Sequence, residues 1–271
     1  MSKRCIFCKK NSGGSRSVEH ILPESLGNKE HTLPAGVVCD PCNNYFASGI
    51  EKPVLESGHF MTGRFNALIP NKREKMPLLP AMLLPVTRRE GELYAYRAEV
   101  TRDARGDFYM DAEPTAEGGI VSGEIRRLII PASGAKPQRD IFSRFLAKVA
   151  VECMALRMLE NAPELLPEFI DDGQISSLSG YARFGKCGVL WPYSERRIYT
   201  PDRLFRKDTE EYEVLHEWTF LYTDKGEMYF VMAILGIEYA MNMGGPDVEG
   251  YEAWLRANHG QSPLYPAGLV D

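Results

Sequence analysis

The chain has 271 residues, 44% hydrophobic and 25% charged, a composition that excludes a disordered or fibrous protein. Its net charge of -5 excludes a uniformly basic surface for nucleic acid. The charge is uneven, however: residues 1–79 contain 11 Lys and Arg against 7 Asp and Glu, which favours a local contact with phosphate groups near the N-terminus.

The sequence shows neither a secretory signal nor a membrane-spanning segment. The N-terminus has no apolar signal segment, and the longest apolar run, near residues 229–237, is too short to cross a bilayer. We therefore expect a cytoplasmic protein without a membrane contact, whose thiols stay reduced. The isolated Cys153 and Cys187 are expected to be buried as small hydrophobic residues.

The first 50 residues predict a small module. Cys5 and Cys8 lie at one tight turn, and residues 18–22 form a short strand that Pro23 ends. A turn follows at residues 26–28, and a helix begins at Asp40 or Pro41, within the second cysteine pair.

The remaining elements predict an α+β fold. Asp140 is expected to cap a long helix whose apolar residues recur at spacings of three and four through Met154. Further helices are expected at 163–170 and 248–257, and strands at 82–86, 92–100, 107–111, 126–130, 188–192, 214–222 and 228–237. We expect a small N-terminal zinc-stapled module (1–60), a linker (61–79), and a larger α+β domain (80–271) with a mostly antiparallel sheet and a long helix.

Four cysteines form two CxxC pairs, Cys5 with Cys8 and Cys39 with Cys42. Each CxxC turn brings two thiolates within reach of one metal ion, and two such turns complete the tetrahedron that zinc prefers. The 30 residues between the pairs exceed the ~15–20 of a usual zinc ribbon, so a folded segment must lie between them. A rubredoxin-like iron site is the alternative, which colour would distinguish.

Three polar residues lie between the two CxxC pairs or directly after the second pair. Glu19 and His20 lie in the segment between the pairs, and Asn43 directly follows the second pair. Carboxylate and carboxamide oxygens are ligands for a hard divalent ion, and a neutral imidazole can take a proton from water. The combination is typical of a phosphodiester-hydrolysing site.

The compound pattern CxxC…EHIxPxxLG…CxxCNN resembles the HNH (ββα-metal) endonucleases, in the branch with a four-cysteine structural zinc. The resemblance covers about residues 3–50. It implies that His20 is the general base, that Glu19 and Asn43 bind a catalytic Mg²⁺ or Mn²⁺, and that the four cysteines hold zinc.

The pattern departs from the family in three places. Glu19 stands where Asp is commoner, and Asn44 is an alternative to Asn43. The middle Asn that orients the base is replaced by Asn28, by His31 or by no side chain. Basic residues that flank the site are candidates for phosphate contacts, namely Lys9, Lys10, Arg16 and Lys29.

The sequence therefore predicts a metal-dependent endonuclease, with DNA as the expected nucleic acid and defence or DNA processing as the expected role. One alternative is a non-catalytic zinc module that binds nucleic acid or protein. A second alternative is a structural or regulatory protein that a metal ion stabilises. Its residues 80–271 would then recognise a partner protein, an effector or a second copy in a homodimer. That region offers isolated His216 and His259, and Glu211, Glu213 and Glu217 on the expected exposed side of a strand.

Overall fold

The computed structural model describes residues 4–85, 96–112, 125–185, 189–200, 203–207 and 210–265. The chain divides into two compact units: unit 1 contains Met1–Val54 and Pro137–Asp271, and unit 2 contains Leu55–Lys136. Both units combine helices with antiparallel sheets, which confirms the α+β class. The chain thus contributes to unit 1 two segments that are distant from each other in the sequence.

The N-terminal part of unit 1 has a ββα arrangement. Strands β1 (Glu19–His20) and β2 (Thr32–Leu33) pair antiparallel, and the 3₁₀ turn η1 (Glu24–Leu26) lies between them. Helix α1 (Asp40–Phe46) follows, with Pro41 in its first turn, where proline is well tolerated. The helical segment continues through the π-helical turn η2 (Ala47–Glu51) into α2 (Lys52–Leu55).

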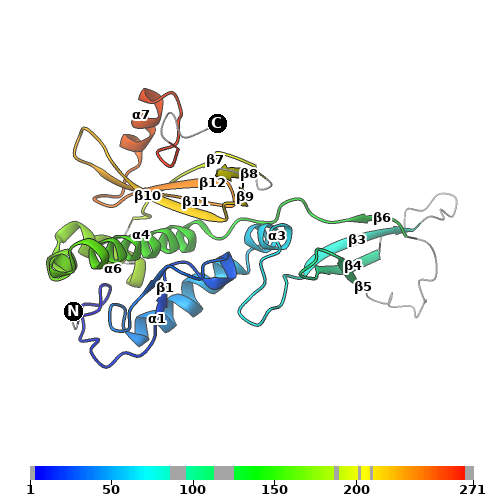
Figure 1. Ribbon diagram of the computed structural model, residues 1–271, viewed down its shortest axis with the longest axis horizontal. Coiled ribbons are helices and arrows are strands. Elements are labelled where there is room, and N and C mark those ends of the chain that lie inside the picture. Colours follow the sequence, from blue (N-terminus) through cyan, green and yellow to red (C-terminus); the bar gives the residue numbers. More distant parts are fainter. Residues whose placement is uncertain are drawn as a thin grey trace. The chain divides into compact units, whose positions relative to one another are not determined.

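Helix α4 (Arg139–Asn161) is the centre of unit 1. Its residues from Phe142 to Ala155 are buried on all sides, except for the half-buried Arg144. Figure 1 shows α4 between the C-terminal sheet and the N-terminal elements, which explains burial all round instead of the single stripe expected. Gln138 is the N-cap, so the predicted cap at Asp140 is wrong; Asp140 lies in the first turn, where its charge still favours the helix dipole.

The C-terminal sheet of unit 1 has the strand order β10-β11-β12-β7, all antiparallel. The strand expected at 228–237 is two strands, because Leu235 and Gly236 both take positive φ and form a tight turn. The prediction of a strand at 188–192 is wrong for the described residues 189–192, which form no strand. The strand of this region is β7, a few residues later. The bounds are β7 Ser194–Arg197, β10 His216–Tyr222, β11 Met228–Ile234 and β12 Ile237–Asn242.

This sheet is covered on both faces. The ring of Tyr239 on β12 lies 4.8 Å from Phe142 of α4, and Tyr229 on β11 lies 5.7 Å from Tyr251 of α7 (Glu249–Ala257). The helix expected at 248–257 is thereby confirmed. Among the described residues, no helix has the length and apolar sequence needed to span a membrane.

Two further elements of unit 1 differ from expectation. The expected helix at 163–170 is a 3₁₀ turn, η3 (Pro163–Leu165), followed by α5 (Leu166–Asp171). Helix α6 (Gly173–Phe184) was missed because its Gly and Ser content lowers helix propensity; Asp172 caps it through two backbone hydrogen bonds of 2.9 Å.

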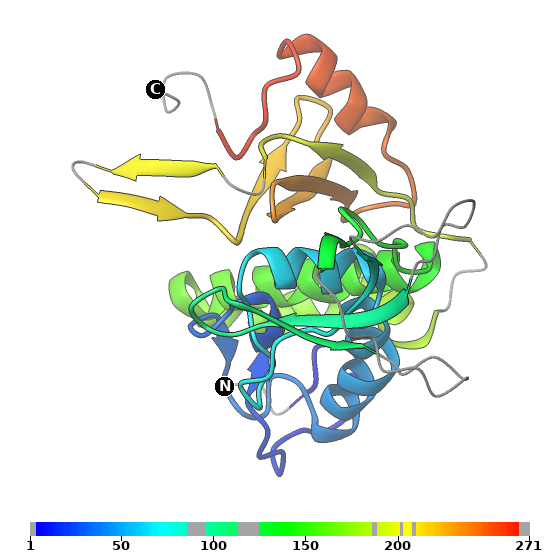
Figure 2. The ribbon, with the colours of Figure 1, turned by 90° about the vertical axis from the view of Figure 1, so that its right-hand side faces the viewer.

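The small hairpin of β8 (Leu204–Lys207) and β9 (Glu210–Glu213) precedes β10 (Figure 2). Glu217 on β10 is half-buried and accepts hydrogen bonds from the hydroxyls of Tyr199 and Tyr265, so the expectation that it lies on an exposed strand face is wrong. Cys153 is buried as expected, whereas Cys187 lies outside the described residues.

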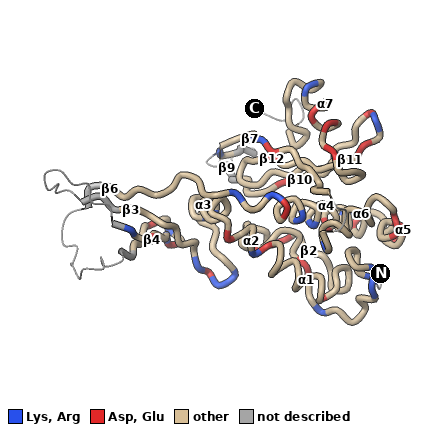
Figure 3. The backbone as a smooth tube through the Cα atoms, turned by 180° about the vertical axis from the view of Figure 1, so that it is seen from behind, with Lys and Arg blue, Asp and Glu red and all other residues tan. Residues whose placement is uncertain are grey.

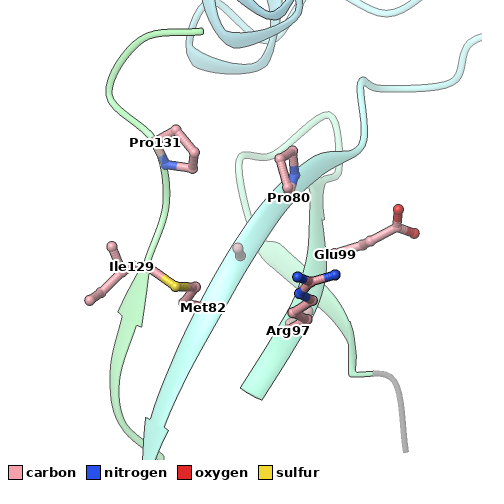
Figure 4. Close-up of a pocket in the computed structure, with 8 residues that line it drawn as sticks. Pro80, Met82, Arg97, Glu99, Ile129 and Pro131 are labelled. Carbon is pink, nitrogen blue, oxygen red and sulfur yellow. The ribbon is translucent and has the colours of Figure 1, made fainter. Parts of the chain in front are cut away.

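Unit 2 contains helix α3 and a four-stranded antiparallel sheet of order β5-β4-β3-β6. One face of the sheet packs on Phe65 of α3. The other face carries a cavity of about 560 Å³, beside which Arg97 and Glu99 project (Figure 4). The bounds are α3 Gly58–Asn66, β3 Leu79–Pro85, β4 Tyr96–Arg102, β5 Phe108–Ala112 and β6 Ile125–Ile129.

Candidate active site

The four cysteines of the two CxxC pairs form one cluster. Their sulfur atoms all lie within 4.8 Å of one another, and the sulfurs of Cys8 and Cys39 are 3.6 Å apart. Tetrahedral zinc with Zn–S bonds of about 2.3 Å would separate two sulfurs by about 3.8 Å, so the cluster is compatible with a structural zinc. The turn at the first pair is closed by a hydrogen bond from the Lys9 amide to the Cys5 carbonyl.

Hydrogen bonds and burial shift the thiol pKa values in opposite directions. The pKa of Cys5 falls to about 5, chiefly because it accepts a hydrogen bond from the Cys42 side chain. Burial raises the pKa of Cys39 to about 11, and the contact with Cys5 raises the pKa of Cys42. One thiolate is therefore already favoured, and metal binding must displace the protons of Cys39 and Cys42.

Arg183 of α6 lies outside the cluster and supports it. Its Nε donates a hydrogen bond of 3.3 Å to the Cys42 sulfur, and its guanidinium lies 3.8 Å from the centre of the Tyr45 ring. We expect Arg183→Gln to weaken zinc retention about tenfold, because loss of a partner around metal ligands typically costs ~10–100-fold in affinity. Competition with a chelator measures this change. Arg157→Gln on α4 is the control, and equal zinc retention in both variants would contradict the role of Arg183.

His20 ends β1, and its side chain is 25% exposed. Its Nε2 lies 3.0 Å from a carboxylate oxygen of Glu24 in η1, whereas its Nδ1 is buried and has no hydrogen-bond partner among the described residues. In a neutral imidazole one nitrogen carries hydrogen and the other accepts it. A carboxylate at Nε2 favours hydrogen on that nitrogen and leaves Nδ1 as the acceptor.

Glu19 precedes His20 but is directed into the protein. Its side chain is buried, and its Oε1 lies 2.8 Å from Nζ of Lys148 on α4. Burial raises the pKa of Glu19, and the charge of Lys148 partly offsets this effect. Its Oε2 is buried without a hydrogen-bond partner among the described residues, so one oxygen remains for an ion.

The two candidate amides behave differently. Asn43 in the first turns of α1 donates from its amide nitrogen to the Val18 carbonyl at 3.4 Å, which leaves its side-chain oxygen as the candidate ligand. Asn44 is exposed, and its backbone carbonyl accepts a hydrogen bond from Ser48. The structure thus brings Asn43, and not Asn44, to the segment that carries Glu19 and His20.

Asn28 and His31, the candidates for the missing middle Asn, serve the loop between the strands. The Asn28 amide donates to the carbonyls of Leu22 and His31 at 2.8 and 3.0 Å, and its oxygen accepts from two backbone amides. The exposed His31 lies near His216, with ring centres 6.2 Å apart. Glu24 is instead a residue whose side chain contacts the His20 ring.

Of the four basic residues predicted to contact phosphate, three are exposed and one is half-buried. Lys10, Arg16 and Lys29 are exposed, and Figure 3 shows Lys and Arg in the N-terminal segment. Lys9 is half-buried, and its ammonium donates a hydrogen bond to the Ser176 hydroxyl of α6. Its side chain therefore joins two segments of unit 1. Three of the four predicted residues therefore remain accessible to a ligand.

The loop after η1 packs on the C-terminal part of unit 1 at Gly27. Gly27 has φ +85°, and a Cβ there would lie 2.5 Å from Leu215 Cδ1. We expect Gly27→Ala to destabilise unit 1 by about 1–2 kcal/mol through backbone strain at positive φ, with a smaller added cost because the end of the flexible Leu215 side chain must move away. Denaturant unfolding measures this change. Gly226→Ala is the control, because it has φ +78° with open space around it; equal costs would contradict packing on Leu215.

Sequence reasoning missed two groups of residues at the site. Glu24 was missed because it contacts His20 through a 3₁₀ turn that the sequence did not reveal. Lys148 was missed because a lysine is rarely fully buried, so its place in an apolar helix gave no reason to single it out. A signal was present: Lys148 and Glu152 are four residues apart and lie among residues that are apolar on several sides.

This part of the chain is a ββα module with a cluster of four cysteines that could hold a metal ion and a carboxylate–imidazole pair at the end of its first strand. Residues 5–57 match the model of the HNH endonuclease family, so this segment is similar to the modules of that family. The match supports, in broad terms, a nuclease function and binding of nucleic acid. Comparisons with curated proteins and with solved structures found no match.

Proposed function

We propose that the protein is a metal-dependent endonuclease that hydrolyses phosphodiester bonds, with DNA as its substrate. The observation that carries the proposal is the state of His20: its ring is held by Glu24 at Nε2, and its Nδ1 lacks a hydrogen-bond partner among the described residues. A water molecule bound at Nδ1 would satisfy that nitrogen and be ready to lose a proton to it.

Two side-chain oxygens are the proposed ligands for a divalent ion. Glu19 Oε2 is buried without a hydrogen-bond partner among the described residues. The Asn43 side chain uses its amide nitrogen to contact the Val18 carbonyl, so its oxygen is the atom proposed to bind the ion. Mg²⁺ is commonly held by one or two carboxylates together with waters and substrate phosphate, so a small donor set is sufficient. When bound, Mg²⁺ or Mn²⁺ would polarise the scissile phosphate and neutralise the leaving oxygen.

The protein's own residues would then act in sequence. Lys10, Arg16 and Lys29 bind backbone phosphates. His20 removes a proton from the attacking water through Nδ1, while Glu24 keeps the ring oriented and stabilises the imidazolium that forms. Glu24 thus takes the orienting role that the family assigns to its middle Asn. The products are a 5′-phosphate and a 3′-hydroxyl end.

The test is incubation of plasmid DNA, linear DNA and RNA with the purified protein in Mg²⁺, Mn²⁺ or chelator, beside a metal analysis for zinc. Metal-dependent nicking of DNA is the expected result. Binding without cleavage under every metal condition would instead support the non-catalytic zinc module. A role in defence or DNA processing, and a partner protein or homodimer contact through residues 80–271, remain predictions.

A further inference from the structure

Lys148 is a charged residue in the interior of unit 1. It lies in the middle of α4, and its side chain is 0% exposed. Its Nζ is within 2.9 Å of carboxylate oxygens of Glu19, Glu51 and Glu152. Nζ also donates to the backbone carbonyls of His20 and Ile21, both at 3.2 Å.

This arrangement is costly for the fold. A buried ion pair seldom stabilises more than apolar residues of the same volume, because both charges lose their hydration. Three carboxylates around one ammonium also leave an excess of negative charge. Burial raises the pKa of Glu152 well above its ordinary value, which favours its neutral form and lessens that excess. Stability alone therefore gives little reason for a lysine at this position.

The contacts of Lys148 converge on the candidate site. Of its five oxygen partners, three belong to Glu19, His20 and Ile21, 127 to 129 residues earlier in the chain. Its Nζ contacts one carboxylate oxygen of Glu19 and donates hydrogen bonds to the carbonyls of the two successive residues His20 and Ile21. The other two partners, Glu51 and Glu152, belong to the helical elements η2 and α4.

We propose that Lys148 is a positioning residue of the nuclease centre, an inference that rests on the proposed function. By holding Glu19 Oε1 and the His20 carbonyl, it sets where Glu19 Oε2 and the His20 ring lie. Loss of the ammonium frees Glu19 to rotate and leaves the carboxylates without their cation. The nuclease centre therefore includes α4, and the N-terminal 60 residues do not make a complete site.

Lys148→Met tests this inference, with Glu152→Gln as the matched control. Glu152 contacts the same ammonium from one helical turn away, and in the described part of the chain no ion pair joins it to β1, where the charge of Glu19 acts on it only electrostatically. We expect Lys148→Met to lower kcat about 100-fold with little change in KM, because a displacement of about 1 Å can cost that factor. Glu152→Gln should stay within about threefold of the wild-type kcat.

Divalent ion binding provides a second measurement. Titration of Mn²⁺ into the zinc-loaded protein without nucleic acid should show several-fold weaker binding in Lys148→Met than in the wild type, because Glu19 is no longer held in place as a ligand. A purely structural role would lower stability but leave the Mn²⁺ affinity of the folded protein unchanged. Unchanged kcat or unchanged Mn²⁺ affinity in the folded variant would overturn the proposal. If Lys148→Met does not fold, Lys148→Met with Glu152→Gln removes one carboxylate together with the cation and is judged by the same criteria.

A third measurement separates this inference from the proposed function. The ring signals of His20, assigned in NMR spectra by comparison with His20→Ala, should shift in Lys148→Met and remain in place in Glu152→Gln. If the wild-type protein cleaves no nucleic acid, the proposed function fails, and these signals still decide the role of Lys148. If His20→Ala is inactive and Lys148→Met matches the wild type in all three measurements, only the role of Lys148 fails.

Discussion

His20→Ala is expected to abolish cleavage while the protein keeps its zinc and its melting temperature. The side chain is partly exposed and ends a two-residue strand, so its removal takes little apolar contact from the core. Its chemistry is not replaced, because Glu24 is directed to Nε2 rather than to the attacking water. Loss of a general base typically costs ~10²–10⁴-fold in rate.

The measurement is the nicking rate of supercoiled plasmid in Mg²⁺ and in Mn²⁺, beside zinc analysis and thermal unfolding. His259→Asn is the matched control, because His259 is exposed beyond α7 and Asn accepts its positive φ of 54°. The control should cut at the wild-type rate. A cutting rate for His20→Ala equal to that of the control would remove His20 from the mechanism.

Cys39→Ser is expected to release zinc and to unfold the N-terminal part of unit 1. Binding of a structural zinc contributes on the order of 10–16 kcal/mol of apparent free energy in small zinc modules, and this energy is available only to the folded form. The two-residue strands β1 and β2 offer few hydrogen bonds of their own. We also expect the loss to reach α4, because Lys148 and the buried core residues of β1 and β2 pack together within one unit.

Zinc content, circular dichroism and cleavage rate measure this outcome. Cys153→Ala is the control: Cys153 is also buried and reduced, but it lies on α4 outside the sulfur cluster. It should keep one zinc per chain and lose about 1–2 kcal/mol of stability, as expected for a small cavity. Normal folding and cutting by Cys39→Ser would show that the four-cysteine cluster does not staple the module.

The short-range features of this protein were predictable from its sequence. The two CxxC pairs, the pair Glu19-His20 and the start of α1 depend on residues a few positions apart, where spacing directly sets geometry. The long apolar helix and the break between the strands expected at 214–222 and 228–237 were visible for the same reason. The end of β11 was not, because Leu235 is an unusual residue for a turn with positive φ.

Contacts between distant segments were decided only by the tertiary structure. Lys148 meets Glu19, Arg183 meets Cys42, and residues 137–265 join the N-terminal module in one unit while unit 2 lies between them in the chain. The spacing of apolar residues shows that a helix has an apolar side, but it does not show how many neighbouring elements cover the helix. From the spacing alone, α4 was therefore expected to bury one stripe. A lysine on such a helix is expected in solvent, and the carboxylates that make its burial tolerable come from elements that only folding brings together.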